Sequence, residues 1–323
     1  SWLERLHGMQ EVTGSTPVFS TKGHLHRVAF FVGAPAPSCV PIANLPIMEH
    51  RPIEQLFHPT DLSPGSTTAF LHALRIATVT RSRLTIMHVA EDEDMNWSEL
   101  PGVRATLARW GLIAGAEDMD GLMRLGVGVK KVVTEGGDPA KACTEYLEKH
   151  PTDLIVLSTH QHGGRMGWLK RRVAEPLSRD AHVPTLFLPH ERPGFVDPDT
   201  GAVNIRNILV PMAHDPHPRP AIRAAVRMAH QLAGGPVRIT LLHVGGADAA
   251  PQPDVPTVEG ITWDHQVRGG EVEESILQVA ADREADLIVM TTKGHEGFLD
   301  ALRGNTTERV LRQARCPVLA TLS

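Results

Sequence analysis

The stretch TDLIVLST at residues 152–159 returns as ADLIVMTT at residues 285–292, and LTIMHV at 84–89 returns as ITLLHV at 239–244. Self-similarity of this kind is the mark of a structural repeat. The sequence therefore predicts two copies of one unit. The second copy is shorter between its second and third apolar runs, where residues 245–256 are rich in Gly, Pro and Asp and are expected to form a loop.

Short apolar runs alternate with helical patterns through both copies. Strands that are apolar on both faces and alternate with helices indicate a parallel sheet covered on two sides. We therefore predict an α/β fold with two tandem, doubly wound, Rossmann-like parallel-sheet domains of five strands each. The expected strands are 53–58, 84–89, 127–133, 154–158 and 185–188, then 208–212, 239–244, 262–267, 287–291 and 318–322. The expected helices are 64–80, 103–110, 140–150 and 173–180, then 219–232, 272–282 and 306–315.

The predicted domain boundaries follow from this pattern. Domain 1 covers residues 51–192, domain 2 covers residues 205–323, and the Pro- and Gly-containing segment 193–204 is expected to link them. Edge strands need cover, so we expect the last strands of the two copies, 185–188 and 318–322, to meet around a pseudo-two-fold axis. The chain would then be an intramolecular pseudo-dimer. Whether it pairs further into a homodimer, or binds a protein partner, stays open.

Residues 1–50 differ from the rest, and we expect a poorly structured extension there. Their apolar run, 28–32, is shorter than the core of a secretory signal. Back-translation of residues 12–21 is compatible with the T-arm of a transfer-RNA gene running into its CCA end. One hypothesis is therefore that the segment is a non-native start and that Met48 is the true first residue.

Charge and composition exclude several classes of protein. The chain has 32 Lys and Arg against 37 Asp and Glu, a net charge of −5, so no global basic field for nucleic acid is present. No apolar run approaches the roughly 18 residues that cross a bilayer, and we expect no membrane partner. The 3 cysteines are scattered, which fits a reducing compartment and predicts a cytoplasmic protein.

The sequence after the fourth strand of copy two suggests a phosphate site. Gly304, Asn305, Thr306 and Thr307 open the last helix there. Glycine lets the backbone approach a phosphate closely, and the amides at a helix start attract anions. Ligands of doubly wound sheets bind at this carboxyl edge. Asn and Thr are also ordinary helix caps, and that reading stays open.

Two stretches resemble the universal stress protein family: residues 307–319 resemble its last helix and strand, and residues 206–211 its first strand. The resemblance covers residues 51–323 as two tandem copies and implies domains of the adenine-nucleotide-binding type. Nucleotide-binding members of the family carry a Gly, two residues, a Gly, nine residues, then Gly and Ser or Thr. Copy two has Thr291 in place of the first Gly, keeps Gly294 and Gly304, and has Asn305 in place of the hydroxyl residue.

The resemblance implies ATP or another adenine nucleotide as ligand, with or without Mg²⁺. In copy two the implied contacts are Pro211, Ala213, Val244, Thr291, Gly294, Gly297, Gly304, Asn305, Thr306 and Thr307. In copy one they are Asp61, which in the family contacts the nucleoside, and Val89.

The two copies divide the family pattern between them. Copy one keeps Asp61 but has Gln161, Arg171 and Arg172 at the phosphate positions, so its phosphate loop is degenerate. Copy two keeps the glycines but has Ala213 where copy one has Asp61. Neither copy carries the complete site.

Other clusters give weaker signals. The basic residues Arg165, Lys170, Arg171 and Arg172 are typical of a solvated surface, with anion binding as the alternative. Neither the pair His160 and His162 nor the group His214, Asp215 and His217 is expected to form a metal site, because convergence of three or four ligands does not follow from the sequence. His88 and His243 end matching strands and are expected to be structural.

The function implied by the resemblance is a stress-response factor governed by an adenine nucleotide in domain 2. No G-x-S-x-G, H-E-x-x-H or Walker A motif is present, so we expect a binding protein rather than an enzyme. Two alternatives stay open: an interaction scaffold that binds no nucleotide, and a weak nucleotide hydrolase.

Overall fold

The computed structural model describes residues 52–90, 100–135, 138–159, 183–189, 192–292 and 306–323, all within the unit His50–Ser323. The first repeat contains β1 (Gln55–Pro59), α1 (Pro64–Thr80), β2 (Arg83–Ala90), α2 (Val103–Arg109), α3 (Met119–Leu125), β3 (Gly128–Glu135), α4 (Pro139–Lys149), β4 (Leu154–Thr159) and β5 (Thr185–Pro189). The second contains β6 (Asn207–Met212), α6 (Arg219–Leu232), β7 (Val237–Val244), the short 3-10 helix η2 (Ala247–Ala249), β8 (Ile261–Arg268), α7 (Val272–Asp282), β9 (Leu287–Thr292), α8 (Thr306–Gln313) and β10 (Val318–Leu322).

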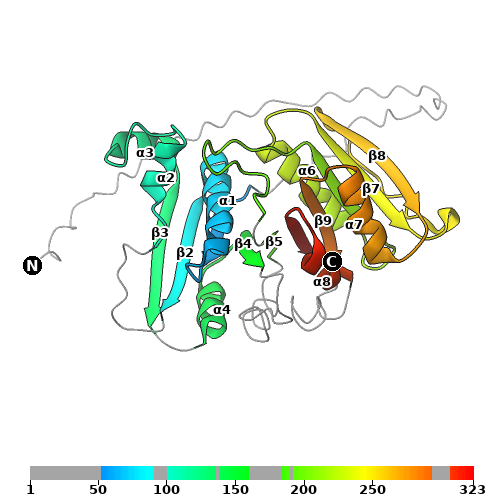
Figure 1. Ribbon diagram of the computed structural model, residues 1–323, viewed down its shortest axis with the longest axis horizontal. Coiled ribbons are helices and arrows are strands. Elements are labelled where there is room, and N and C mark those ends of the chain that lie inside the picture. The colour runs from blue at the N-terminus through cyan, green and yellow to red at the C-terminus, as the bar shows by residue number, and fades with distance from the viewer. Residues whose placement is uncertain (1–51, 91–99, 136–137, 160–182, 190–191, 293–305) are drawn as a thin grey trace, which may run out of the picture. The chain divides into compact units, whose positions relative to one another are not determined.

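The two sets of five strands join into one ten-stranded sheet in the order β3-β2-β1-β4-β5-β10-β9-β6-β7-β8 (Figure 1). Pairs within each repeat are parallel, and the repeats meet through the antiparallel pair β5 and β10, with Leu186 opposite Leu319. The predicted fold class is confirmed, and so is the predicted meeting of the two last strands. Each repeat covers the edge that the other would expose.

The sheet is buried on both faces, which explains its near-continuous apolar strands. Every residue of β4 and β9 is buried. Leu154 and Val156 belong to one hydrophobic cluster, which includes residues of α1 and α6, while Ile155 and Leu157 belong to a second, which includes residues of α4, α7 and α8. Helices therefore cover both faces, as a doubly wound fold requires (Figure 1).

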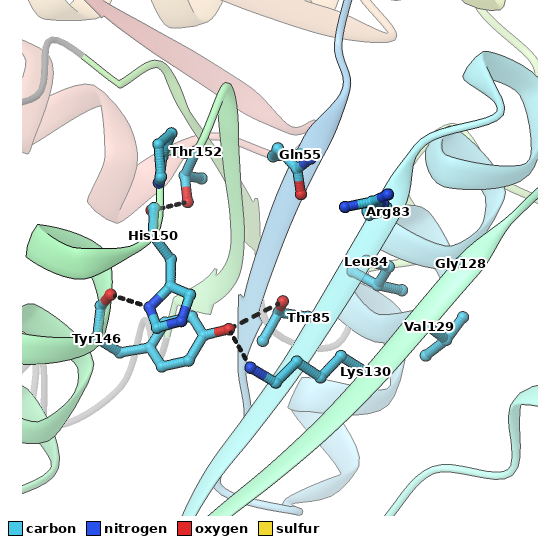
Figure 2. A pocket seen from close by; sticks show the side chains of 11 residues that line it. Gln55, Arg83, Leu84, Thr85, Gly128, Val129, Lys130, Tyr146, His150 and Thr152 are labelled. Carbon is cyan, nitrogen blue, oxygen red and sulfur yellow. Dashed lines mark hydrogen bonds between the residues drawn. The ribbon is translucent and has the colours of Figure 1, made fainter. Parts of the chain in front are cut away.

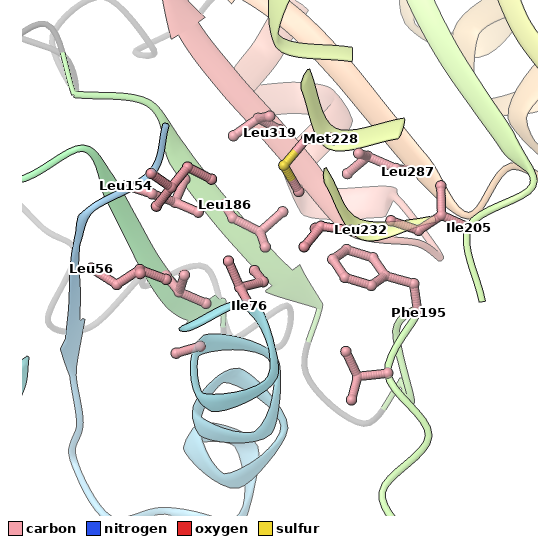
Figure 3. Packing of buried hydrophobic residues seen from close by; sticks show 14 of the residues in the cluster. Leu56, Ile76, Leu154, Leu186, Phe195, Ile205, Met228, Leu232, Leu287 and Leu319 are labelled. Atoms are coloured by element: carbon pink, nitrogen blue, oxygen red, sulfur yellow. The ribbon is translucent and has the colours of Figure 1, made fainter. Parts of the chain in front are cut away.

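The first cluster runs through both repeats. Leu56 and Ile76 of the first repeat and Met228 and Leu287 of the second are buried in the same cluster (Figure 3). The tandem arrangement is thus held by a shared core as well as by the β5–β10 pair.

The segment between the repeats packs into this core. Phe195 and Val196 are buried, and Val196 forms a bridge with Val203. The side chain of Trp110 donates from Nε1 to the carbonyl oxygen of Pro198 at 3.1 Å. Residues 193–204, predicted as a linker from their composition, therefore form ordered contacts with the first repeat.

Helix boundaries follow local sequence signals. α1 begins where the Ser63 hydroxyl accepts from the N–H of Ser66 and Pro64 takes the first helical position. The predicted bounds of α1, α6 and α7 are confirmed. The short helix α3 was not predicted: its seven residues are fewer than the window in which a helical period can be recognised, and they include Gly121, a poor helix former.

Several predictions fall on undescribed residues. The extension 1–50, the proposed start at Met48 and the predicted helix 173–180 lie outside the part of the chain that the structure describes. Among the described residues, no helix combines the length and apolar character needed to cross a bilayer.

Candidate functional site

The strand order places a topological switch point, which we call the crevice, at the carboxyl edge of the second repeat. β7 and β8 lie on one side of β6, and β9 and β10 lie on the other, so the chain reverses direction across the sheet between β6 and β9. β7 pairs with every residue of β6. By contrast, β9 pairs only with Ile208 and Leu209 of β6 among the described residues. The carboxyl ends of β6 and β9 therefore separate, and ligands of open α/β sheets bind at such a point.

Two helices begin at this edge. α6 follows β6 and begins at Arg219, and α8 follows β9 and begins at Thr306. Thr306 is the first described residue after the segment 293–305, and it is already helical. Amides at the first turn of a helix lack partners within the helix, and the helix dipole adds positive potential there. At α6 the N–H groups of Arg219 and Ala221 already have acceptors, so the start of α8 is the one of the two that can attract an anion.

Thr291 lies at the end of β9 and is almost fully buried. Its hydroxyl accepts a hydrogen bond of 3.1 Å from the N–H of Ala221, in the first turn of α6. The residue before α6, Pro218, offers no side-chain cap. Thr291 therefore caps a helix from a neighbouring strand, which ties β9 to α6 at the rim of the crevice.

The two threonines at the start of α8 differ in exposure. Thr307 is buried at 4%, and Thr306 is half-buried. Only Thr306 keeps accessible surface for a ligand. Glu308 in the same turn is paired with Arg312 one turn later, so its negative charge is partly offset.

The remaining described positions of the predicted site lie at the ends of β6 and β7. Pro211 is half-buried within β6, Ala213 is exposed directly after it, and Val244 is half-buried at the end of β7. These three positions and Thr291 come from strands that share one edge. Gly294, Gly297, Gly304 and Asn305 lie outside the described residues, and their part in the site stays a prediction.

The loop that follows β6 carries a carboxylate to which the family resemblance assigns no nucleotide contact. The first repeat needs residues 60–63 to pass from β1 to α1, while the second uses the longer segment 213–218. Asp215 stands in this loop and is exposed, and the neighbouring His214 places Nε2 at 3.0 Å from the carbonyl oxygen of Ala249. A position-by-position comparison pairs Ala213 with Asp61 and misses Asp215; the unequal loop length is the signal that points to it.

His88 and His243 hold the strand ends together. Nδ1 of His88 lies 2.8 Å from the carbonyl oxygen of Thr60, and Nδ1 of His243 lies 3.3 Å from that of Met212. Each ring therefore donates from the end of the second strand of its repeat to the end of the first. Their predicted structural role is confirmed.

The carboxyl edge of the first repeat is organised differently. Oδ1 of Asp61 accepts from the N–H of Ser63 at 3.0 Å and from the hydroxyl of Ser66. Both partners belong to the start of α1, so the carboxylate helps to cap that helix. Val89 is half-buried near the end of β2. Gln161, Arg171 and Arg172 of the degenerate loop lie outside the described residues.

Metal ligands do not gather in the described part of the chain. Within the described ranges, no three His, Cys, Asp or Glu side chains lie close enough to hold a metal ion. His160 and His162, and the basic cluster Arg165, Lys170, Arg171 and Arg172, fall outside these ranges.

Comparison with known families accounts for this architecture. The family model described as "Universal stress protein family" matches residues 54–189 and 255–321, which is more than half of the chain. The chain belongs to the universal stress protein family. The two matched regions fall in the two repeats, so this universal stress protein is of the tandem type.

Curated relatives match short segments of this universal stress protein. A universal stress protein E homolog of Haemophilus influenzae is 44% identical over 61 residues, which cover 19% of this chain and 20% of that protein. A universal stress protein of Methanocaldococcus jannaschii is 38% identical over 60 residues, covering 19% of this chain and 35% of that protein. The matches thus span about a fifth and about a third of these relatives.

A solved structure shares the fold over most of the chain. The crystal structure of a universal stress protein from Archaeoglobus fulgidus superimposes with a TM-score of 0.54 at 17% identity, covering 83% of this chain and 96% of the other. At this identity the likeness concerns the fold alone. The fold of both repeats is therefore shared with a solved member of the family.

Proposed function

We propose that this tandem universal stress protein is a cytoplasmic stress-response factor that binds an adenine nucleotide, ATP or AMP, in its second repeat. The bound form includes Mg²⁺ where the nucleotide carries it. Repeat one contributes the fold of the pseudo-dimer and, at most, a weaker contact through Asp61 and Val89.

One observation carries the proposal: α8 begins at Thr306 beside the crevice where β6 and β9 separate. The residues just before it in the sequence are Gly304 and Asn305, which suit close approach of a phosphate to the backbone. In the proposed complex the phosphates face the start of α8, and the base lies toward Val244 and Ala213 at the ends of β7 and β6.

The described residues limit what each side chain can contribute. The Thr291 hydroxyl accepts from the N–H of Ala221, so Thr291 positions the rim, and the group it can still offer to an anionic ligand is its hydroxyl proton. Thr306 supplies an accessible hydroxyl. No step of bond breaking follows from these groups, and we propose binding, not catalysis.

A second candidate function, an interaction scaffold without nucleotide, is favoured by a specific observation. The Asp61 carboxylate and the Thr291 hydroxyl both serve as helix caps, and Ala213 brings no polar group. If both groups serve only to cap these helices, the protein keeps the duplicated fold but has no nucleotide site.

The cytoplasmic location is supported by the thiols. Cys143 and Cys316 are both free, and burial raises the pKa of each to about 12. Free, unreactive thiols fit a reducing compartment. Fractionation of native cells with an antibody to the chain tests the location.

Calorimetric titration of the purified chain with ATP and AMP, with and without Mg²⁺, tests the proposal. Nucleotide released by heating the purified protein gives an independent reading. The variant Gly304→Arg copies the residue that repeat one carries at the matching position, and we expect it to weaken binding at least about tenfold by blocking the backbone approach.

The matched control is Gly234→Arg. This variant adds the same charge at a place where an added Cβ meets nothing within 4 Å. Nucleotide affinity should therefore stay within a factor of two. Absence of binding at millimolar nucleotide would favour the scaffold. Steady phosphate release that Gly304→Arg abolishes would instead identify a hydrolase.

A further inference from the structure

A cavity lies at the amino ends of the first-repeat strands, away along the sheet from the candidate nucleotide site at β6 and β9. It encloses about 350 Å³ near the amino ends of β1, β2 and β3. Its walls are Gln55, residues 83–85 and residues 128–130 from the strands, with Tyr146 of α4 and residues 150–152 beyond that helix (Figure 2). All of these residues belong to the first repeat, so the cavity is independent of the proposed function above.

One wall is a fixed aromatic surface. The rings of Tyr146 and His150 are stacked, with centroids 3.9 Å apart and an interplanar angle of 4°. Nδ1 of His150 donates to the carbonyl oxygen of Tyr146 at 2.7 Å, and the Tyr146 ring also stacks with Phe57 at 5.6 Å. The tyrosine hydroxyl faces the strands, 3.4 Å from Thr85 Oγ1 (Figure 2). These contacts hold both rings in place without a ligand.

The strand side of the cavity is positively charged. Lys130 Nζ lies 3.3 Å from the Tyr146 hydroxyl and 5.2 Å from the centre of its ring. Arg83 is exposed and extends over Gly128, where an added Cβ would meet Arg83 Cγ at 3.2 Å. Within the described residues, neither Arg83 nor Lys130 forms an ion pair with a carboxylate. The cavity therefore gathers cationic groups that lack an anionic partner in the described part of the chain.

The nearest acidic groups have other partners. Oδ2 of Asp153 accepts from the backbone N–H groups of Glu54 and Gln55, both at 3.0 Å. Glu145, the residue before Tyr146, forms an ion pair with Lys141. These carboxylates are engaged with the backbone or along α4, so they do not neutralise Arg83 and Lys130 by direct ion pairs.

The matching place in the second repeat carries different side chains. Lys130 pairs with Thr85 in the sheet, and the matching pair in the second repeat is Asp264 with Thr240. Arg283, the first residue after α7, takes the place of His150, the first residue after α4, and forms an ion pair with Asp264 at 2.9 Å.

Two more substitutions go in the same direction. Val279 of α7 stands where α4 has Tyr146, and Thr262 stands where β3 has Gly128. The matching place in the second repeat thus holds an ion pair of its own. The first repeat has a lysine in place of the acid and a glycine in place of the threonine, so its cationic groups have no ion-pair partner among the described residues.

We propose that this cavity binds a small organic anion. The charged group, a carboxylate or a phosphate, lies between Arg83 and Lys130, and the body of the molecule packs against Tyr146 and His150. Charge-assisted hydrogen bonds from Lys and Arg are the strong contacts of such sites, and the volume is at the lower end of the range for small-molecule pockets.

The chain offers a specific reporter, because Tyr146 is its one tyrosine. Protein labelled with ring-¹³C tyrosine gives NMR signals from this cavity alone. We would titrate the full chain with phenyl phosphate, with benzoate and with neutral benzamide. We expect a saturable shift of the Tyr146 signal with at least one of the two anions and none with benzamide. Which anion binds identifies the charged group.

Variants that copy the second repeat test the geometry. Lys130→Asp and Gly128→Thr should each weaken anion binding at least about tenfold, by charge reversal and by filling the space. The control Arg238→Gln changes the second-repeat counterpart of Arg83, and affinity should stay within a factor of two. Thermal melting of each variant checks that it folds.

Three results would overturn the proposal: no saturable shift of the wild-type Tyr146 signal at millimolar anion, equal shifts with benzamide, or unchanged affinity in a folded Lys130→Asp variant. The wild-type titration decides the first two even if a variant fails to fold.

Discussion

The imidazole of His72, in the middle of α1, accepts a hydrogen bond of 3.0 Å from the backbone N–H of Phe195, in the segment between the repeats. The same Nε2 accepts from the N–H of Val196 at 3.1 Å, and Nδ1 donates to the carbonyl oxygen of Thr68 at 2.8 Å. The ring therefore has to be neutral, with its proton on Nδ1. Because His72 is fully buried, this side chain satisfies two backbone donors that no water can reach.

Replacing His72 by leucine should destabilise the whole unit. Leucine has a similar size to histidine but no acceptor atom, so the N–H groups of Phe195 and Val196 would lose their hydrogen-bond acceptor. Each buried unsatisfied donor costs about 1–3 kcal/mol, so for two donors we expect the free energy of unfolding to fall by about 2–6 kcal/mol. Urea unfolding followed by circular dichroism measures this. His230→Leu, at an exposed position of α6, is the control, and an equal loss in both variants would contradict the role of His72.

Stability should also decline in mild acid. Burial lowers the pKa of both His58 and His72 from 6.5 to about 4. Below pH 6.5 the unfolded chain takes up protons that the folded chain does not, so stability falls as the pH drops from about 6.5 toward about 4. The linkage relation gives a loss of about 2 kcal/mol per histidine between neutral pH and about pH 5.

The variant His72→Gln, which cannot titrate in this range, isolates one of the two histidines. Its unfolding free energy at neutral pH will be lower than that of the wild type. Its decline between neutral pH and about pH 5 should be smaller by about 2 kcal/mol. Parallel pH profiles for the two proteins would show that the His72 ring is not the titrating group.

The segment between the repeats should be sensitive to added methyl groups. Gly201 has a φ of +68°, and a Cβ there would lie 2.5 Å from Cδ2 of Trp110. Gly201→Ala must therefore move the indole that bonds Pro198, and we expect a loss of about 2–4 kcal/mol in the free energy of unfolding. Gly234→Ala is the matched control because a Cβ there meets nothing. Similar unfolding midpoints for the two variants would mean that the segment is held loosely.

The sequence predicted the elements whose signals are local or repeated. The helix bounds of α1 and the meeting of β5 with β10 follow from caps, periodicity and the need of an edge strand for a partner. The structural role of His88 and His243 followed from their matching positions. In each case the information lies in a short stretch or in the comparison of the two copies.

Features that depend on distant partners could not be predicted in this way. Residues 193–204 read as a linker by composition, yet their order depends on His72 and Trp110, which stand far away in the sequence. The cavity beside Tyr146 likewise depends on which strand residue faces the end of α4. That register becomes visible only when Lys130 and Asp264 are found at matching places in the sheet.

Thr291 allows a final separation of structural from ligand-binding roles. Its hydroxyl accepts a hydrogen bond from the N–H of Ala221, and Ala221 is fully buried. Thr291→Val keeps the shape and removes the acceptor, so we expect a loss of about 1–3 kcal/mol in the free energy of unfolding. Nucleotide affinity should stay within a factor of three. Thr262→Val, an exposed position of β8, should change stability by less than about 0.5 kcal/mol. Weaker nucleotide binding at an unchanged free energy of unfolding would instead show that the Thr291 hydroxyl contacts the ligand. In that case the hydrogen bond from Ala221 would not contribute to stability.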